Sequence, residues 1–198
     1  MTAKQIIDIA AAEMGYTESP PNSNKTKYGQ WYGLDGQPWC MMFVQWCFAQ
    51  AGAPLPYKTA SCSALERWYR ANKPDAVHTT PRPGDIVIYS FGHTGIIVDS
   101  AGDSITAIEG NTSADYNGSQ NNGGGVYRRT RSKSKVTAYI RPFDFPGVEM
   151  QKNHFNESLK TARSNYKHYF RKNKAGSWSK DIKEWEKAMG LFEGNGTR

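Results

Sequence analysis

Apolar residues recur at helical spacing in the first third of the chain. Within residues 1–16 they share one helix face, at Ile6, Ile7, Ala10 and Met14. The spacing also predicts helices over 40–51, which starts just after Pro38, and over 61–72. The polar, turn-rich stretch 17–36 predicts a loop between the first two helices.

β-Branched residues alternate with other types from about residue 85 onward, after two prolines and a glycine that end the helical pattern. The alternation predicts strands at 85–90, 93–98, 104–109, 126–129 and 137–143. Helices therefore come first and an antiparallel sheet second, which is the order of an α+β domain. Pro146 and Gly147 within 143–147 indicate a linker or a domain end.

Composition restricts the class of protein. Hydrophobic residues make up 38% of the chain, and no apolar run approaches the ~20 residues that cross a membrane. Residues 1–16 lack the basic start and apolar block of a secretion signal. Three cysteines form no dense disulfide framework, which suits synthesis in a reducing cytosol.

The net charge of +7 is concentrated near the C-terminus. Residues 151–198 contain 11 Lys+Arg and 5 Asp+Glu, a net of +6. This cationic appendage predicts docking to a polyanion: nucleic acid, an anionic membrane face or the acidic polymers of a bacterial wall. A solvated helix surface explains the same charge without a partner.

Cys40 occupies the first turn of the second predicted helix. Unpaired backbone N–H groups and the positive end of the helix dipole favour a thiolate there, and lower the pKa below the usual value of about 8.5. His93 follows in the sequence, and this thiol and imidazole indicate a cysteine hydrolase. Only Cys40 has the helix-start position. We interpret Cys47 as a core residue and Cys62 as a capping or core residue, with a bridge between those two as an open alternative.

A hairpin between the second and third strands predicts a partner for His93. If the hairpin is symmetrical, Val98 pairs with Ser104. The same register places His93 directly across from Glu109, with Cβ atoms about 4.5–5.5 Å apart. Asn111 points to the same face if the strand continues, and a slipped register exchanges Asn111 for Glu109. Either side chain can hold the imidazole in one tautomer, as a nucleophile–base pair requires.

Five short segments together resemble the CHAP family, the cysteine, histidine-dependent amidohydrolase/peptidases of phage endolysins and bacterial wall hydrolases. They are Lys27-Tyr28-Gly29, Pro38-Trp39-Cys40, Gly84-Asp85-Ile86-Val87, Gly92-His93-Thr94-Gly95 and Glu109-Gly110-Asn111. The resemblance covers residues 1–145 and implies a papain-like α+β catalytic domain. It implies Cys40 as nucleophile, His93 as general base, and Glu109 and Asn111 as the residues that complete the catalytic group.

The resemblance also bears on the oxyanion and on cofactors. Related papain-like wall peptidases use a tyrosine upstream of the cysteine to stabilise the oxyanion, which implies Tyr28 with the Cys40 backbone N–H. Gln37 competes for this role. Some family members bind calcium through acidic residues ahead of the cysteine, but residues 22–27 contain no carboxylate. We therefore expect no cofactor and no metal site, with calcium as an open alternative.

Aromatic residues make up 13% of the chain and crowd the segment before the cysteine. Trp31 and Trp39 are candidates for lining a groove that binds sugars and peptides. Packing in the core would explain their presence equally well. We interpret the glycine-rich loop 115–125 as an edge of that groove or as a plain flexible loop.

Residues 151–198 predict a small amphipathic helical hairpin. A basic helix over 157–172 leads through a turn to a second helix, which Ser177 caps. The apolar face of this second helix consists of Trp178, Ile182, Trp185 and Met189. The hairpin loosely resembles a single repeat of the surface-layer-homology type, which attaches proteins to wall polymers. We expect it to bind the wall, to form homo-oligomers or to pack on the catalytic domain.

Together with these patterns, the resemblance implies a peptidoglycan hydrolase of the endolysin type that cleaves amide bonds of the bacterial wall. Such a protein is synthesised in the host cytoplasm and acts on the wall, with peptidoglycan and acidic wall polymers as partners, and with no specific nucleic-acid partner and no membrane span. The alternatives are a papain-like protease or acyltransferase acting on proteins, a non-catalytic wall-binding protein, and a zinc protein that uses Cys40, Cys62 and His93.

Overall fold

The computed structural model describes residues 1–115, 118–119 and 122–144. The chain divides into two units, Met1–Phe145 and Pro146–Arg198. The predicted C-terminal hairpin, with its expected wall-binding and oligomerising roles, lies outside the described residues.

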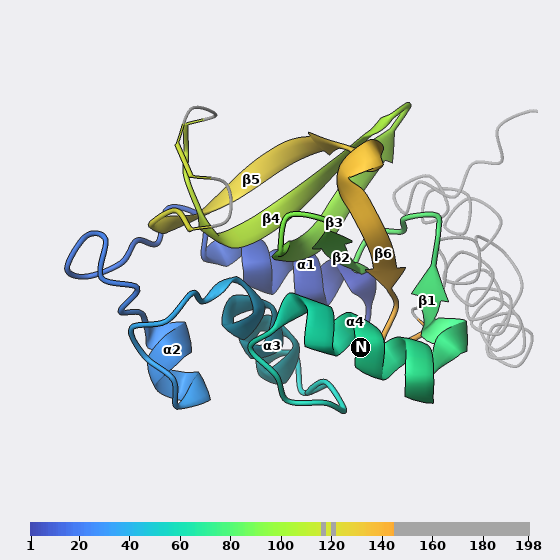
Figure 1. The fold of residues 1–198 in the computed structure, drawn as a ribbon, viewed down its shortest axis with the longest axis horizontal. Helices are drawn as coiled ribbons and strands as arrows, with labels where there is room; N and C mark the ends of the chain where they lie inside the picture. Colours follow the sequence, from blue (N-terminus) through green and yellow to red (C-terminus); the bar gives the residue numbers. More distant parts are fainter. Residues whose placement is uncertain (116–117, 120–121, 145–198) are drawn as a thin grey trace, which may run out of the picture. The chain divides into compact units, whose positions relative to one another are not determined.

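Helices precede the sheet along the described chain, which confirms the predicted α+β class (Figure 1). The helices are α1 (Ala3–Ala12), α2 (Lys27–Tyr32), α3 (Cys40–Gln50) and α4 (Cys62–Asn72), with short 3-10 turns η1 (Pro74–Ala76) and η2 (Lys133–Lys135). The strands are β1 (Val77–His78), β2 (Ile86–Tyr89), β3 (His93–Ala101), β4 (Ser104–Thr112), β5 (Gly125–Ser132) and β6 (Val136–Ile140). They form one antiparallel sheet in the order β1-β6-β2-β3-β4-β5. Within the described residues, no helix is long and apolar enough to cross a membrane.

Polar side chains fix where the first helices begin. Thr2 and Gln5 form a reciprocal capping box at the start of α1. That helix ends at Ala12, so the expectation that Met14 belongs to its apolar face is wrong, and Met14 is exposed. Helix α2 lies in the stretch predicted as a loop. Its N-cap Thr26 accepts a hydrogen bond from the Gly29 backbone at 3.0 Å, a local signal hidden among polar residues.

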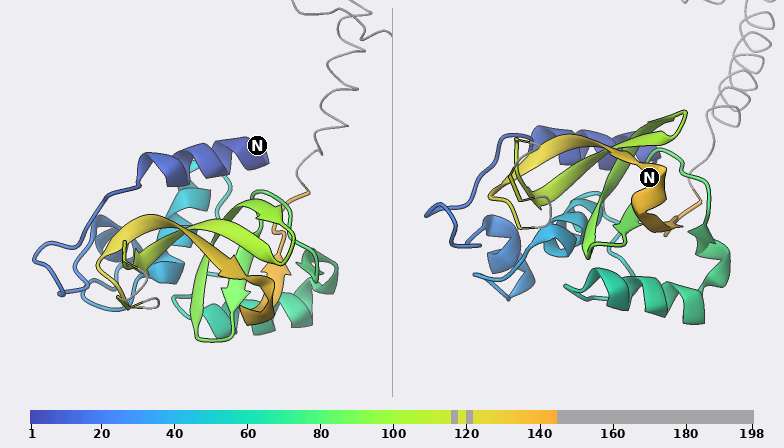
Figure 2. Two further views of the ribbon diagram at one scale, coloured as in Figure 1. Left: turned by 90° about the horizontal axis from the view of Figure 1, so that it is seen from above. Right: turned by 45° about the horizontal axis from the view of Figure 1, so that its top comes forward.

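The main core lies between the helices and one face of the sheet. Side chains on alternate strand positions supply that face, at Ile86, Ile88, Ile96 and Ile108. Helix α3 is buried along almost its whole length, and it contacts β3, β4 and α1 (Figures 1 and 2). The opposite face carries a smaller cluster that includes Tyr89 and Ile97. Because α3 is held on several sides, its first residue has a fixed place relative to β3 and β4.

The hairpin of β3 and β4 differs from the predicted register. Ala101 pairs with Ser104, so a two-residue turn joins the strands, whereas the predicted strands 93–98 and 104–109 leave residues 99–103 between them. The pairing shifts between Ile97 and Asp99, which leaves Val98 as an extra residue in a bulge. The predicted pairing of Val98 with Ser104 is therefore wrong, because neither the tight turn nor the bulge was anticipated.

Candidate active site

Cys40 is the first residue of α3, and a close packing contact holds that end of the helix against the sheet. A Cβ atom at Gly110 of β4 would lie 2.7 Å from both Phe43 Cβ and Trp39 Cζ3. Only a glycine allows the strand to approach the helix so closely. Gly110 thus keeps the first turn of α3 beside Glu109, the residue that precedes it in β4.

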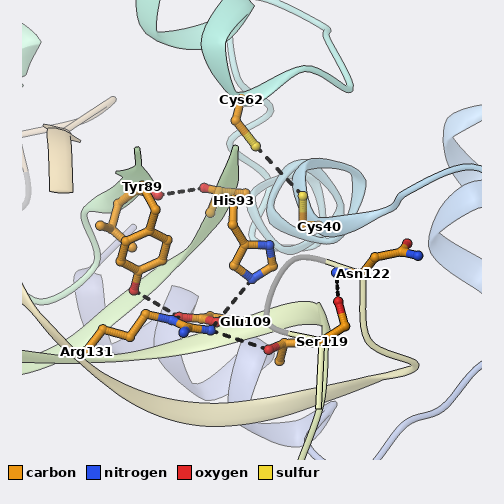
Figure 3. Close-up of polar contacts among 11 residues, drawn as sticks. Cys40, Cys62, Tyr89, His93, Glu109, Ser119, Asn122 and Arg131 are labelled. Carbon is orange, nitrogen blue, oxygen red and sulfur yellow. Dashed lines mark hydrogen bonds and ion pairs between the residues drawn. The ribbon is translucent and has the colours of Figure 1, made fainter. Parts of the chain in front are cut away.

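Cys62 lies next to Cys40, with the two sulfur atoms 3.8 Å apart (Figure 3). Cys62 is the first residue of α4, so the expectation that only Cys40 has a helix-start position is wrong. Cys47 is buried within α3, as predicted for a core residue. All three cysteines are free thiols, which excludes the alternative of a Cys47–Cys62 bridge in this structure.

His93 begins β3 and is fully buried. Its Nε2 lies 3.1 Å from Oε2 of Glu109. Its Nδ1 is buried, has no hydrogen-bond partner within the described chain, and lies on the edge of the ring turned toward Cys40 (Figure 3). The imidazole therefore stands between thiol and carboxylate, with one nitrogen for each.

The Glu109 carboxylate is held by two residues that the sequence analysis did not identify. The Tyr89 hydroxyl donates to Oε1 at 2.9 Å, and Arg131 donates from Nε to Oε1 at 2.7 Å and from Nη2 to Oε2. The guanidinium also lies over the rings of Tyr89 and Phe91, each 5.3 Å from the centroid. One signal for Tyr89 was available, because it pairs directly with His93 across the short turn between β2 and β3. Arg131 lies 22 residues from Glu109, and no local pattern indicates that contact.

Charge distribution in this cluster favours a thiolate–imidazolium pair. The hydrogen bond with Cys62 holds the pKa of Cys40 well below its usual value, against the effect of burial, and His93 lowers it further. Burial alone would lower the pKa of His93, but Cys40 and Glu109 together raise it to about 9. Burial opposes ionisation of Glu109, yet Arg131 and then His93 lower its pKa. Each partner thus stabilises the charged form of its neighbour.

Asn111, the other predicted catalytic residue, is fully buried in a bulge of β4. The pairing with β5 shifts between Glu109 and Thr112, and Asn111 adopts a left-handed backbone with φ of 58°. Asparagine tolerates this conformation better than most residues. The Nε2 hydrogen bond of His93 goes to Glu109, so a role for Asn111 in orienting the imidazole stays a prediction.

The two oxyanion candidates occupy different environments. Tyr28 is fully buried, and its hydroxyl donates to Glu13 at 2.5 Å. Burial raises the pKa of Tyr28, and the Glu13 carboxylate raises it further. Because the single hydroxyl hydrogen is already donated, this geometry does not favour Tyr28 as an oxyanion donor. Gln37 is exposed and lies three residues before Cys40, so it stays available for that role.

The two tryptophans predicted to contact substrate also differ in their exposure. Trp39 is fully buried, stacks on Tyr28 with ring centroids 5.3 Å apart, and donates its indole N–H to Glu18 at 3.0 Å. Core packing explains it, and the predicted substrate contact finds no support. Trp31 on α2 remains 43% exposed and is free to contact a ligand.

A cavity of about 450 Å³ lies between the segment around Glu18 and the end of β4. Its lining includes Asp115, Gly118 and Gly124 from the glycine-rich loop, together with Thr112, Ser113 and Tyr127. The loop interpreted as a groove edge does border a depression in the described part of the chain.

The structure gives no support for the zinc alternative. Cys40, Cys62 and His93 do lie close together, but among the described residues no group of three or more His, Cys, Asp or Glu side chains is arranged to hold a metal ion. The calcium alternative finds no support either. The Glu18 carboxylate lies near residues 22–27, but it already accepts hydrogen bonds from the Asn24 backbone at 2.9 Å and from Trp39.

Comparisons with known proteins show what the domain resembles. Residues 31–111 match the CHAP domain family, and this segment includes Cys40, His93, Glu109 and Asn111. No curated protein sequence matches the chain. Similar solved structures include the crystal structure of the wild-type endolysin LysIME-EF1 (17% identity, TM-score 0.47, covering 73% of this chain and 66% of that one). Another is the crystal structure of Ly7917 (18% identity, TM-score 0.44, covering 72% and 62%), so the chain spans slightly less than two thirds of either structure. Residues 31–111 are thus similar to the CHAP domain family, over less than half of the chain.

Proposed function

We propose that this protein is a peptidoglycan hydrolase that cleaves amide bonds of the bacterial cell wall with Cys40 as nucleophile. The observation that carries the proposal is the row formed by Cys40, His93 and Glu109, in which Glu109 binds Nε2 and the Nδ1 edge faces the thiol. His93 and Glu109 are fully buried, whereas Cys40 keeps 5% exposure. Cys40 is therefore the member of the row through which a substrate reaches the site.

The geometry supports the following sequence of proton transfers. The Cys40 thiolate attacks the amide carbonyl carbon and forms a tetrahedral oxyanion. His93 then gives its Nδ1 proton to the leaving amine, because Nε2–H stays donated to Glu109. The C–N bond breaks and a thioester remains. His93, now neutral, takes a proton from water, which attacks the thioester and releases the carboxylic acid and the thiolate.

Other residues have supporting roles in this proposal. The Cys40 backbone N–H at the start of α3 and the Gln37 side chain are the proposed oxyanion donors. Asn111 completes the catalytic group beside Glu109. The exposed Trp31 and the cavity bordered by Thr112 and Asp115 are the proposed contacts for wall peptides or sugars.

The remaining proposals concern where the protein acts. It is made in the cytoplasm of a bacterial host and reaches the wall from there. The excess positive charge of residues 151–198 attracts acidic wall polymers.

Parallel digestion of purified peptidoglycan and casein tests the substrate class. We expect the protein to release soluble wall fragments and to leave casein intact, and mass spectrometry of the fragments identifies the bond. Cleavage of casein alone supports the alternative of a protein-directed protease. Binding to walls without any released fragment supports the non-catalytic alternative.

A further inference from the structure

Cys62 brings a second thiol into the site, and the proposed chemistry does not use it. Its sulfur lies 3.8 Å from that of Cys40, within the range of a sulfur–sulfur hydrogen bond (Figure 3). Both residues are almost fully buried, at 6% and 5% exposure. Water therefore has little access to replace this contact.

The groups around the two sulfurs decide which one carries the charge. Each cysteine begins an 11-residue helix, so the helix dipole favours a thiolate at both positions. His93 of β3 and the Met41 backbone of α3 act on Cys40, whereas Cys62 has Cys40 itself as its charged neighbour. The imidazolium thus places the negative charge on Cys40, and the proton shared by the pair stays on Cys62.

The geometry points to Cys62 as a positioning residue that keeps its proton and donates an S–H hydrogen bond to the Cys40 thiolate. The bond holds the nucleophilic sulfur on the side of α4, while the Nδ1 edge of His93 from β3 faces it from another side. A hydrogen bond to an ionised acceptor is about twice as strong as one between neutral groups. The contact weakens when the sulfur becomes a neutral thioester and returns when the thiolate leaves.

The titration of Cys62 is consistent with this role. The hydrogen bond to Cys40, and then burial, raise the pKa of Cys62 far above its usual value. A thiol with a raised pKa keeps its proton throughout the working range of the enzyme. Cys62 is therefore a donor and not a second nucleophile.

The inference rests on Cys40 being the nucleophile of the proposed function, so its test uses a reaction that needs no wall substrate. Iodoacetamide alkylates thiolates, and peptide mass mapping reports the rate at Cys40 as a function of pH. The variants are Cys62→Ala and Cys62→Val, which lack a donor, and Cys62→Ser, which keeps one. Cys47→Ala removes a buried thiol from the same helix as Cys40 and is the matched control. Melting curves verify the fold of each variant.

We expect the apparent pKa for alkylation of Cys40 to rise by about one unit in the two non-donor variants, which is about tenfold less thiolate at any pH below both values. Cys62→Ser should shift less, and Cys47→Ala should match the wild type. In the wild type, Cys40 should be labelled before Cys62.

Two results would overturn the inference: a folded non-donor variant that titrates as the wild type does, or wild-type protein in which Cys62 is labelled first. If the pKa shift appears but wild-type protein does not digest walls, the proposed substrate fails while the role of Cys62 stands.

Discussion

Oε2 of Glu109 lies 3.1 Å from Nε2 of His93, although the two residues are not opposite each other in the sheet. Continuing the pairing of Ile96 with Ile108 places Gly95, not His93, beside Glu109. A Cβ atom at Gly95 would lie 2.7 Å from Glu109 Cγ, so the missing side chain leaves the space that the glutamate occupies. The contact between Glu109 and His93 is therefore diagonal.

The diagonal contact makes Gly95 a test of the geometry. We expect Gly95→Ala to push Glu109 away from the imidazole, because the new methyl group also meets the Ile108 carbonyl oxygen at 2.9 Å. Overpacking of this kind costs about 1–3 kcal/mol of stability. Activity at a temperature where the variant is folded should fall more than the unfolded fraction explains. Asp99→Ala, at an exposed position of the same strand, is the control, and wild-type activity in Gly95→Ala would contradict the account.

The charge of Glu109 should set the alkaline limit of activity. The pKa of His93 is raised to about 9, so the imidazolium persists up to about that pH and is lost above it. Glu109→Gln removes one of the two anions that raise this pKa, so the alkaline limb of the kcat/KM profile should move to lower pH. Asp99→Asn leaves the imidazole untouched and should keep the wild-type profile. An unchanged limb in Glu109→Gln would show that Glu109 does not act on His93.

Arg131 and Tyr89 should contribute unequally to stability. Arg131→Met leaves the buried Glu109 charge without its bidentate partner, and breaking such a pair costs about 3–5 kcal/mol. Tyr89→Phe removes a single hydrogen bond to a charged acceptor, for which we expect about 1.5 kcal/mol. Denaturant unfolding measures both. Arg128→Met, at an exposed position of β5, should change stability little, and equal losses for Arg128→Met and Arg131→Met would refute the ion-pair explanation.

The C-terminal charge gives a prediction about wall binding. Residues 151–198 carry +6 of the net charge of +7. Electrostatic attraction is screened over about 8 Å at physiological ionic strength, so wall binding by the full chain should fall steeply with added salt. Protein ending at residue 150 should bind weakly and show little dependence on salt, while it still cleaves a small soluble muropeptide. An unaltered salt response after truncation would rule out the docking role.

Much of the fold follows from local patterns in the sequence. The start of α3 and the order of helices before strands are encoded by nearby residues, such as Pro38 and the β-branched residues of β2. The short helix α2 was missed because six residues provide too little periodicity to stand out from a polar loop. The bulge at Val98 was missed because one extra residue in a strand leaves no periodic trace.

Contacts of the site could be predicted from the sequence when the two residues lie on neighbouring strands, as His93 and Glu109 do. Cys62 and Arg131 enter it through tertiary packing, over separations of 22 residues from Cys40 and from Glu109. Burial reverses the usual expectation for Arg131, since a charged strand residue most often faces solvent. These contacts depend on how α4 and β5 pack against the rest of the domain, which cannot be predicted from the sequence of either element alone.

The most direct test of the proposed chemistry counts new amino groups while purified walls lyse. Wild-type protein and Cys47→Ser should clear a wall suspension and release one amino group for each amide cleaved. Cys40→Ser should do neither, because a serine hydroxyl is not ionised by a neighbouring imidazole in the way that a thiol is. Lysis by Cys40→Ser at the wild-type rate, or clearing by the wild type without new amino groups, would contradict cysteine-dependent cleavage of wall amides.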